Sequence, residues 1–193
     1  MLNKRLYIIP FIMTAVMLSM VSCQRPASPR EYGYYRITIP PASYSLPTWH
    51  EPYRFLLSDY AYVQPVNQGD EQGWMTIIYP AIHAGIHCSY KVVNGNLRQL
   101  IEDAHELVYS HTIKANAIPE HEYFNAEHHV YGVLYELKGN TASPIQFYLT
   151  DSVHHFFRGA VYVDCIPNQD SLQPVIDYLH LDILTLIESF EWR

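Results

Sequence analysis

Histidine is the residue type in this chain best suited to bind a metal, and the sequence contains eleven. His83 and His87 lie four positions apart beside Cys88, and positions i and i+4 of a β-strand share a face, so their imidazoles could converge. The adjacent pairs His128–His129 and His154–His155 would instead point to opposite faces. Zinc needs three or four converging ligands, and neither an HExxH motif nor paired CxxC motifs supply them. His83 and His87 remain candidate ligands, but no metal site is expected.

The residue types of a hydrolase triad occur close together in Asp151, Ser152 and His154. A nucleophilic serine usually lies in a G-x-S-x-G turn, with partners brought from distant loops. That motif is missing from the sequence, as are the P-loop and the G-x-G-x-x-G fingerprint. Asp followed by Ser is typical of a turn. We therefore expect no catalytic residue, no enzymatic activity and no bound cofactor.

The cysteine with the clearest predicted role is Cys23. An apolar stretch, residues 6–20, follows Lys4 and Arg5 and ends in small residues before Cys23, which is typical of a lipoprotein signal peptide. We expect residues 1–22 to be removed and Cys23 to carry a covalent diacylglyceryl and acyl lipid. The alternative is an uncleaved membrane anchor, for which the stretch is short.

The segment after Cys23 predicts where the protein is anchored. Residues 23–33 form the lipidated cysteine and a polar, proline-rich tether, and residues 34–193 form a single domain. Gln24 is not an acidic retention residue, and no acidic run follows the cysteine. These features favour the periplasmic leaflet of an outer membrane.

Charge and cysteine content narrow the function classes further. The net charge of −7 becomes −9 when Lys4 and Arg5 leave with the signal peptide. A chain this acidic has no basic stripe for a phosphate backbone, so nucleic-acid binding is not expected. Besides Cys23, only Cys88 and Cys165 are present, and they form either one disulfide or two free buried thiols.

Seventeen tyrosines make the chain unusually aromatic, and many fall in the N-terminal third of the domain. Tyrosine and tryptophan suit interfaces because each offers a large flat area and one polar group. The same residues also suit a core. The N-terminal group, a candidate partner or ligand groove, consists of Tyr32, Tyr34, Tyr35, Tyr44, Trp49, Tyr53, Tyr60 and Tyr62.

Hydrophobic periodicity predicts strands in the first half of the domain, followed by a helix. Strands are expected at 34–39, 60–63, 74–79 and 82–93, with an irregular proline-rich loop at 40–52. A helix should begin after Asn96, which together with Gln99 has the spacing of a capping box. The polar segment 120–129 should be a loop or an irregular strand.

Three further strands and a long helix are expected in the second half. The strands are predicted near 131–137, 146–149 and 156–163, and the helix at 172–190, capped by Asp170 with Pro174 in its first turn. Short links favour antiparallel pairing, and two amphipathic helices must bury their apolar stripes on the sheet. The sequence therefore predicts an α+β layered sandwich.

Several segments of the C-terminal two-thirds form a recognisable set. They are HTIKA at 111–115, GNTASPIQF at 139–147, TDS at 150–152, HFFRGA at 155–160 and the closing residues 168–192. With the lipoprotein start, this set resembles the GldD family, the gliding-motility lipoproteins of the Bacteroidota. The element order also resembles PsbP-like domains, which are α/β/α sandwiches with a mostly antiparallel sheet packed by two main helices.

The resemblance implies a non-enzymatic, membrane-anchored subunit or assembly factor of the gliding motility and type IX protein secretion apparatus. Its partners would be protein components of that machinery. Within the family-like segment 139–158, the candidate interaction residues are Asn140, Ser143, Gln146, Asp151 and Arg158. The alternative function is a periplasmic module that binds a small ligand or a metal.

Overall fold

The computed structural model describes residues 41–66, 73–110, 115–164 and 169–193, except for the side chains of 169–171. All of them belong to one compact unit, residues 35–193. The predicted signal peptide, Cys23, the tether, the strand expected at 34–39 and Cys165 lie outside the described residues.

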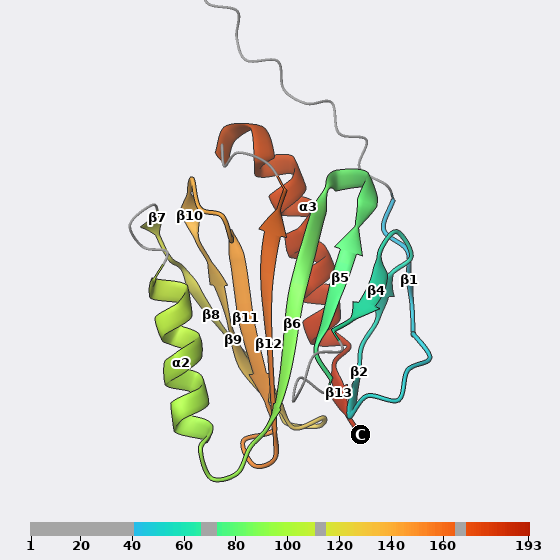
Figure 1. Ribbon diagram of the computed structural model, residues 1–193, viewed down its shortest axis with the longest axis vertical. Helices are drawn as coiled ribbons and strands as arrows, with labels where there is room; N and C mark the ends of the chain where they lie inside the picture. The colour runs from blue at the N-terminus through green and yellow to red at the C-terminus, as the bar shows by residue number, and fades with distance from the viewer. Residues whose placement is uncertain (1–40, 67–72, 111–114, 165–168) are drawn as a thin grey trace, which may run out of the picture. The chain divides into compact units, whose positions relative to one another are not determined.

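A seven-stranded sheet, antiparallel throughout, is the centre of this unit (Figure 1). In spatial order its strands are β4 (Tyr62–Pro65), β5 (Met75–Tyr79), β6 (Ala84–Val92), β12 (His155–Val163), β11 (Ile145–Thr150), β9 (Val130–Glu136) and β8 (Glu120–Asn125). The three consecutive strands predicted in the second half are confirmed, because β9, β11 and β12 are neighbours paired antiparallel. A 3-10 turn, Pro80–Ile82, links β5 to β6.

The polar segment after Pro119 is more regular than expected. β8 pairs with β9 at every position from Glu120 to Asn125 and forms one edge of the sheet. Its side chains are mostly exposed, so the hydrophobic alternation that usually marks a strand is missing. Pairing with a buried neighbour, which is a non-local effect, forms this strand.

Three short pairs border the main sheet. They are β1 (Tyr44–Ser45) with β3 (Leu57–Ser58), β2 (Tyr53–Arg54) with β13 (Glu191–Trp192), and β7 (Ala115–Ala117) with β10 (Lys138–Gly139). The β2–β13 pair joins the beginning of the described chain to its end. Arg54 and Glu191 form an ion pair across it.

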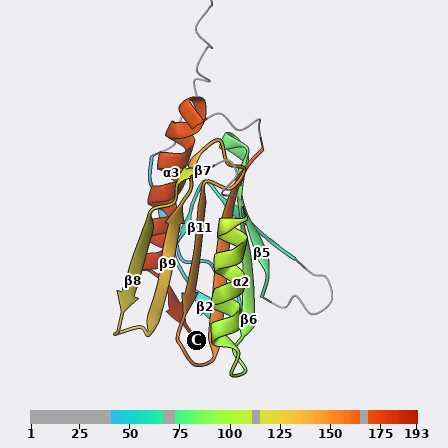
Figure 2. The same cartoon turned by 90° about the vertical axis from the view of Figure 1, so that its left-hand side faces the viewer.

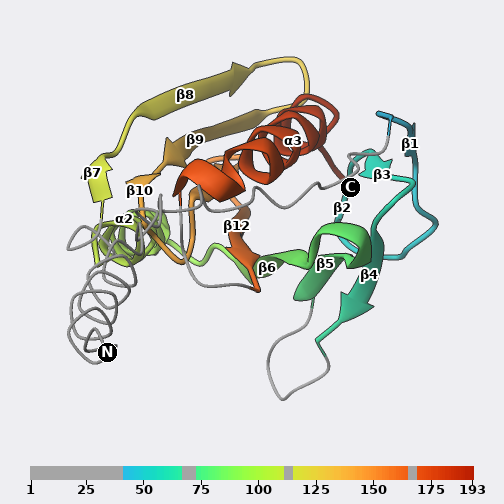
Figure 3. The same ribbon diagram turned by 90° about the horizontal axis from the view of Figure 1, so that it is seen from above.

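The two helices pack on opposite faces of the sheet (Figures 2 and 3). α3 (Gln169–Glu188) covers the larger core, where Leu179, Ile183 and Ile187 meet Ile77, Ile86 and Phe147. α2 (Leu97–Tyr109) covers a smaller core that includes Leu100, Ala104, Val108, Tyr135, Tyr148 and Phe156. This arrangement confirms an α+β fold with two main helices and an antiparallel sheet. None of the described helices is both long and apolar enough to cross a membrane.

The predicted helix caps are wrong in detail. Asn96 occupies the N-cap position of α2 but makes no capping hydrogen bond, because its Oδ1 accepts from the backbone N–H of Asn94 at 2.9 Å. Gln99 donates to Asp103 on the next turn instead of completing a capping box. α3 begins at Gln169, so Asp170 lies inside the helix and Pro174 falls in its second turn.

Candidate functional site

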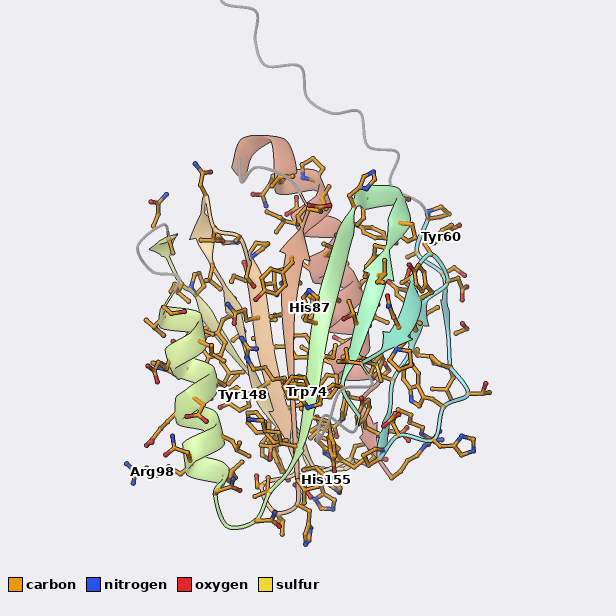
Figure 4. The ribbon with its side chains drawn as sticks, viewed as in Figure 1. Tyr60, Trp74, His87, Arg98, Tyr148 and His155 are labelled. Atoms are coloured by element: carbon orange, nitrogen blue, oxygen red, sulfur yellow. The ribbon has the colours of Figure 1, made fainter. Side chains whose placement is uncertain are left out.

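One half of the sheet face that carries α2 has no described element over it. An α-helix is about 10 Å across with its side chains, whereas seven strands spaced by about 4.8 Å span about 29 Å. A single helix therefore cannot cover the whole face. α2 lies on the side of β9 and β11, and the fronts of β5, β6 and β12 are open (Figures 1 and 4).

We call this surface the open face. It consists of Thr76, Ile78, Gly85, His87, Ser89, Arg158, Ala160 and Tyr162, with Gln146 at the border beneath α2. Burial alternates along the strands that form it. In β5, Met75, Ile77 and Tyr79 are buried toward α3, whereas Thr76 and Ile78 between them are only half-buried. The sequence thus builds one fully covered face and one partly covered face.

Arg158 and Gln146 are brought together at the border of the open face. They lie on the adjacent strands β12 and β11, and an Arg158 Nη2 proton is donated to Gln146 Oε1 over 2.5 Å. Burial lowers the pKa of the Arg158 guanidinium, although the phenol of Tyr162 acts in the opposite direction. Two of the five predicted interaction residues therefore form one structural unit.

Gln146 is almost fully buried, with 1% of its surface exposed. A guanidinium has only donors, so the amide oxygen must face Arg158 and the Nε2 group must point elsewhere. Nε2 has no hydrogen-bond partner among the described residues. A buried donor without a partner costs about 1–3 kcal/mol.

A row of polar side chains continues across the open face from this pair. The Thr76 hydroxyl and the His87 Nδ1 are 3.1 Å apart, and the ring of Tyr162 lies edge-on to His87 with centroids 4.9 Å apart. His87 and Tyr162 are both exposed. Figure 4 shows His87 on the front of β6, clear of α2, whereas Arg98 lies on the outer side of that helix.

The open face carries no acidic side chain, although the chain as a whole has a net charge of −7. On β5, β6, β12 and β11, the residues directed to this side include Lys91, Arg158 and His87 but no Asp or Glu. No ion pair joins Arg158 to a carboxylate in the described ranges. The surface is thus rich in donors and complementary to acidic groups.

Asp151 is a turn residue. Its Oδ1 accepts the backbone N–H groups of Val153, His154 and His155 at 2.8–3.0 Å, and Ser152 has a φ of +70°. Partial burial alone would raise the pKa of the Asp151 carboxyl, but these three bonds lower it below its usual value. The turn interpretation therefore explains Asp151, which lies away from the open face at the β11–β12 connection.

Asn140 and Ser143 belong to the connection between β10 and β11. Asn140 is exposed, whereas Ser143 is fully buried and its hydroxyl has no hydrogen-bond partner among the described residues. The hydroxyl of the neighbouring Thr141 donates to the carbonyl of Leu137 at 3.5 Å. This connection packs into the fold instead of extending from it, and it does not contribute to the open face.

The strand spacing proposed for His83 and His87 is wrong. His83 ends the 3-10 turn in the left-handed conformation, with φ of +48°, and β6 begins only at Ala84. The two imidazoles therefore do not share a strand face as positions i and i+4 would. Within the described ranges, no group of three or more His, Cys, Asp or Glu residues is arranged to hold a metal.

Cys88 is buried and its thiol is free. Burial raises the pKa of this thiol, so the reactive thiolate is disfavoured. Its proposed disulfide partner, Cys165, lies outside the described residues. Cys88 is therefore a core side chain, packed among the strand residues that face α3.

Most described members of the N-terminal aromatic group lie in the core. Tyr53 is fully buried between Phe55 and Phe190, with ring centroids 6.1 and 5.7 Å away, and Trp49 packs edge-on against Phe55. Only Tyr60 and Tyr62 are strongly exposed, with 42% and 52% of their surface accessible. Tyr32, Tyr34 and Tyr35 lie outside the described residues.

A buried carboxylate on α3 was not anticipated from the sequence. Asp182 is 4% exposed, and its Oδ1 accepts a 2.7 Å hydrogen bond from the Tyr44 hydroxyl. Burial raises the pKa of Asp182, and the hydroxyl of Tyr44 partly offsets that effect. Asp182 falls between Leu179 and Leu186 on the apolar stripe, which is the pattern that would have revealed it.

A second unanticipated group surrounds Glu136. Its carboxylate pairs with Lys138 and lies 3.3 Å from His121 Nε2 and 3.2 Å from His180 Nε2. Partial burial alone would raise the pKa of Glu136, but the Lys138 hydrogen bond and the nearby positive charges lower it overall. Glu136 and His180 also border a cavity of about 230 Å³ between the β9–β11 connection and α3.

Comparison with known proteins identifies the family of the chain. Residues 24–192 match the family model described as the gliding motility lipoprotein GldD. This range includes every described helix and all strands of the main sheet. A search of curated proteins gives no match. The resemblance noted in the sequence is therefore confirmed, and the chain belongs to the family of gliding motility lipoproteins GldD.

Proposed function

We propose that this protein is a lipid-anchored accessory subunit or assembly factor of the gliding motility and type IX secretion apparatus, and that it docks a protein component of that apparatus on its open face. Family membership supports a role in gliding. The observation that carries the docking role is the half-covered sheet face, where donor side chains surround a half-buried arginine without an acidic partner.

The proposed anchor is the lipid on Cys23, inserted in the periplasmic leaflet of the outer membrane. The tether of about ten residues reaches at most about 35 Å when fully extended. The partner must therefore lie at the membrane or extend to within that distance of it.

A binding role fits the chemistry of the described residues better than catalysis. Ser152 lies in a turn whose aspartate is committed to backbone hydrogen bonds, and the Cys88 thiol is buried. Neither has the adjacent base and oxyanion donors that a nucleophile requires. The side chains of the open face can instead bind and orient a partner.

A small-ligand module is the second candidate, favoured by the cavity bordered by Glu136 and His180. Its volume of about 230 Å³ lies below the roughly 300–1,000 Å³ typical of small-molecule pockets. A thermal shift caused by a small periplasmic metabolite, with normal gliding and secretion in a deletion strain, would favour this alternative.

The finer fold assignment is also a proposal. An antiparallel sheet between two helices supports a PsbP-like α/β/α sandwich, a fold whose members include assembly factors. Superposition of an experimental structure on PsbP-like domains would test this assignment. Fold alone does not establish function.

A deletion strain tests the proposed function when it is complemented with two matched variants. Tyr162→Asp places a negative charge on the open face, whereas Leu181→Asp places the same charge at an exposed position of α3, where 61% of the leucine surface is accessible. We expect the deletion to abolish spreading and the secretion of type IX cargo, and only Leu181→Asp to restore both. Normal spreading and secretion in the deletion strain would refute the proposal.

A further inference from the structure

Arg158 has more donor capacity than the fold uses. A guanidinium offers five N–H donors in a planar fork, and the structure employs one of them, in the bond to Gln146 Oε1. The side chain is partly withdrawn from water, which lowers its pKa. Arginines that are structural in this setting normally face a carboxylate, and Arg158 faces none among the described residues.

The second unused donor lies beside the first. Gln146 Nε2 is bonded to the same carbon as the oxygen that receives the Arg158 proton, so both groups point to the same small region at the border of α2. An acceptor placed there would pair with the guanidinium and, after a small rotation of the amide, with Nε2. A carboxylate provides two oxygens with about four acceptor positions, which matches this demand.

The surroundings select an acidic group on a protein. Ser89 pairs across the strands with Arg158, and Ala160 pairs with both His87 and Gln146, so small side chains leave space in front of the guanidinium. Tyr162 and Ile78 add partly exposed aromatic and apolar surface, as in the centre of a protein interface. Recognition of an anionic lipid usually needs four to eight basic residues, whereas the strands here contribute only Arg158 and Lys91.

We propose that Arg158 and Gln146 form a carboxylate-binding site that receives an Asp or Glu side chain of the protein docked on the open face. The inference rests on the proposed docking function and names the chemistry of its anchor point. The bound carboxylate satisfies the guanidinium and the buried amide together, so the site discriminates against a partner that carries Asn or Gln at the same position.

The test follows the Gln146 side-chain amide by NMR. The probe is N-acetyl-glutamate amide, added to mature lipidated protein in detergent micelles labelled with ¹⁵N-glutamine, and the matched control probe is N-acetyl-glutamine amide. The Gln146 resonance is identified by its loss in Gln146→Leu. Titration extends to about 50 mM, which fills most of a site whose Kd is about 10 mM.

We expect a saturable shift of the Gln146 amide with the glutamate probe and none with the glutamine probe. Arg158→Met should abolish the shift and Arg158→Lys should weaken binding several-fold, because the ammonium lacks the planar fork. Arg98→Met, which removes an exposed arginine paired with Glu102 on α2, should leave the response unchanged. An unshifted Gln146 amide over the whole titration would overturn the proposal.

Two other outcomes would overturn the choice of occupant. An equal shift with inorganic phosphate would assign the site to a phosphate-bearing ligand. A dimer that forms at increasing protein concentration and is lost in Arg158→Met would assign it to a second copy of this chain. Failure of the docking function itself gives a different result, in which the deletion strain glides and secretes normally although the glutamate probe binds.

Discussion

The hydroxyl of Tyr44 donates a 2.7 Å hydrogen bond to the carboxylate of Asp182, although 138 positions separate the two residues. Tyr44 lies in β1, at the start of the described chain, and Asp182 lies on the inner face of α3. This bond joins the segment nearest the lipid tether to the helix that covers the main core. It also leaves Asp182 Oδ2 without a partner among the described residues.

Asp182→Asn should increase stability at neutral pH by on the order of 1 kcal/mol, because it removes a buried charge and keeps an acceptor for Tyr44. Burial raises the folded-state pKa of Asp182 above the value of 3.8 in the unfolded chain. The stabilisation from this group is therefore fully present below the unfolded pKa and is lost as pH rises through the folded pKa. Urea unfolding between pH 4 and 8 measures the effect.

The matched control for this substitution is Asp177→Asn. Asp177 is exposed on the same helix and accepts a hydrogen bond from Gln173. It should leave the pH dependence of stability as in the parent protein. If Asp182→Asn and the parent lost stability in parallel as pH rises, the buried carboxylate would not be the cause.

Glu136→Gln should have the opposite pH dependence. The pKa of Glu136 is lowered in the folded state, so its contribution is present above the unfolded value of 4.5 and is lost as pH falls through the folded pKa. We expect the variant to be less stable by about 1–2 kcal/mol at pH 7 and equal to the parent in acid. Glu122→Gln, at an exposed position of β8, is the control, and a constant deficit at all pH values would contradict the prediction.

Gly159→Ala should destabilise the fold by about 1–3 kcal/mol, because the added methyl group overpacks the core. A Cβ at Gly159 would lie 2.3 Å from the ring of Phe147, its partner on β11. Gly85→Ala on the adjacent strand β6 is the matched control, since its Cβ would lie 3.4 Å from the nearest atom. Urea denaturation compares the two, and equal midpoints would contradict the packing argument.

Elements with a strong internal period could be predicted from the sequence. The strands β9, β11 and β12 and the helices α2 and α3 each repeat apolar residues with the period of their structure. β8 and the two-residue strands have no such repeat, because only their pairing partners define them. The helix caps were wrong because Asn96 and Gln99 have competing local partners.

The candidate site was predicted only in part, for a similar reason. Gln146 and Arg158 were selected from the family-like segment, but the same segment also contained Asp151, which serves its own turn. The role of His87 and Tyr162 depends on how much of the sheet α2 covers. A helix of 13 residues beneath seven strands leaves an open face, and that comparison of sizes can be made once the sheet is known.

Cys23→Ala should move the protein from the membrane fraction to the soluble fraction without changing its fold. The lipid is the predicted anchor, and the residues that form the sheet and both cores lie beyond position 40. Fractionation with immunoblotting measures the location, and circular dichroism with thermal melting measures the fold. A variant that remained in the membrane fraction would show that another feature anchors the protein.

The double substitution Arg158→Met and Gln146→Leu should separate stability from binding. It replaces a partly buried cation and a buried donor without a partner by apolar groups of similar volume, and such replacements are often neutral or stabilising by about 1–4 kcal/mol. We expect a raised urea midpoint together with loss of gliding in a complemented deletion strain. Arg158→Met alone should be less stable than the double variant, because Gln146 Oε1 then loses its donor as well. A double variant that is both less stable than the parent and fully functional would show that the pair serves the fold, because polar groups kept only for packing are not needed for docking.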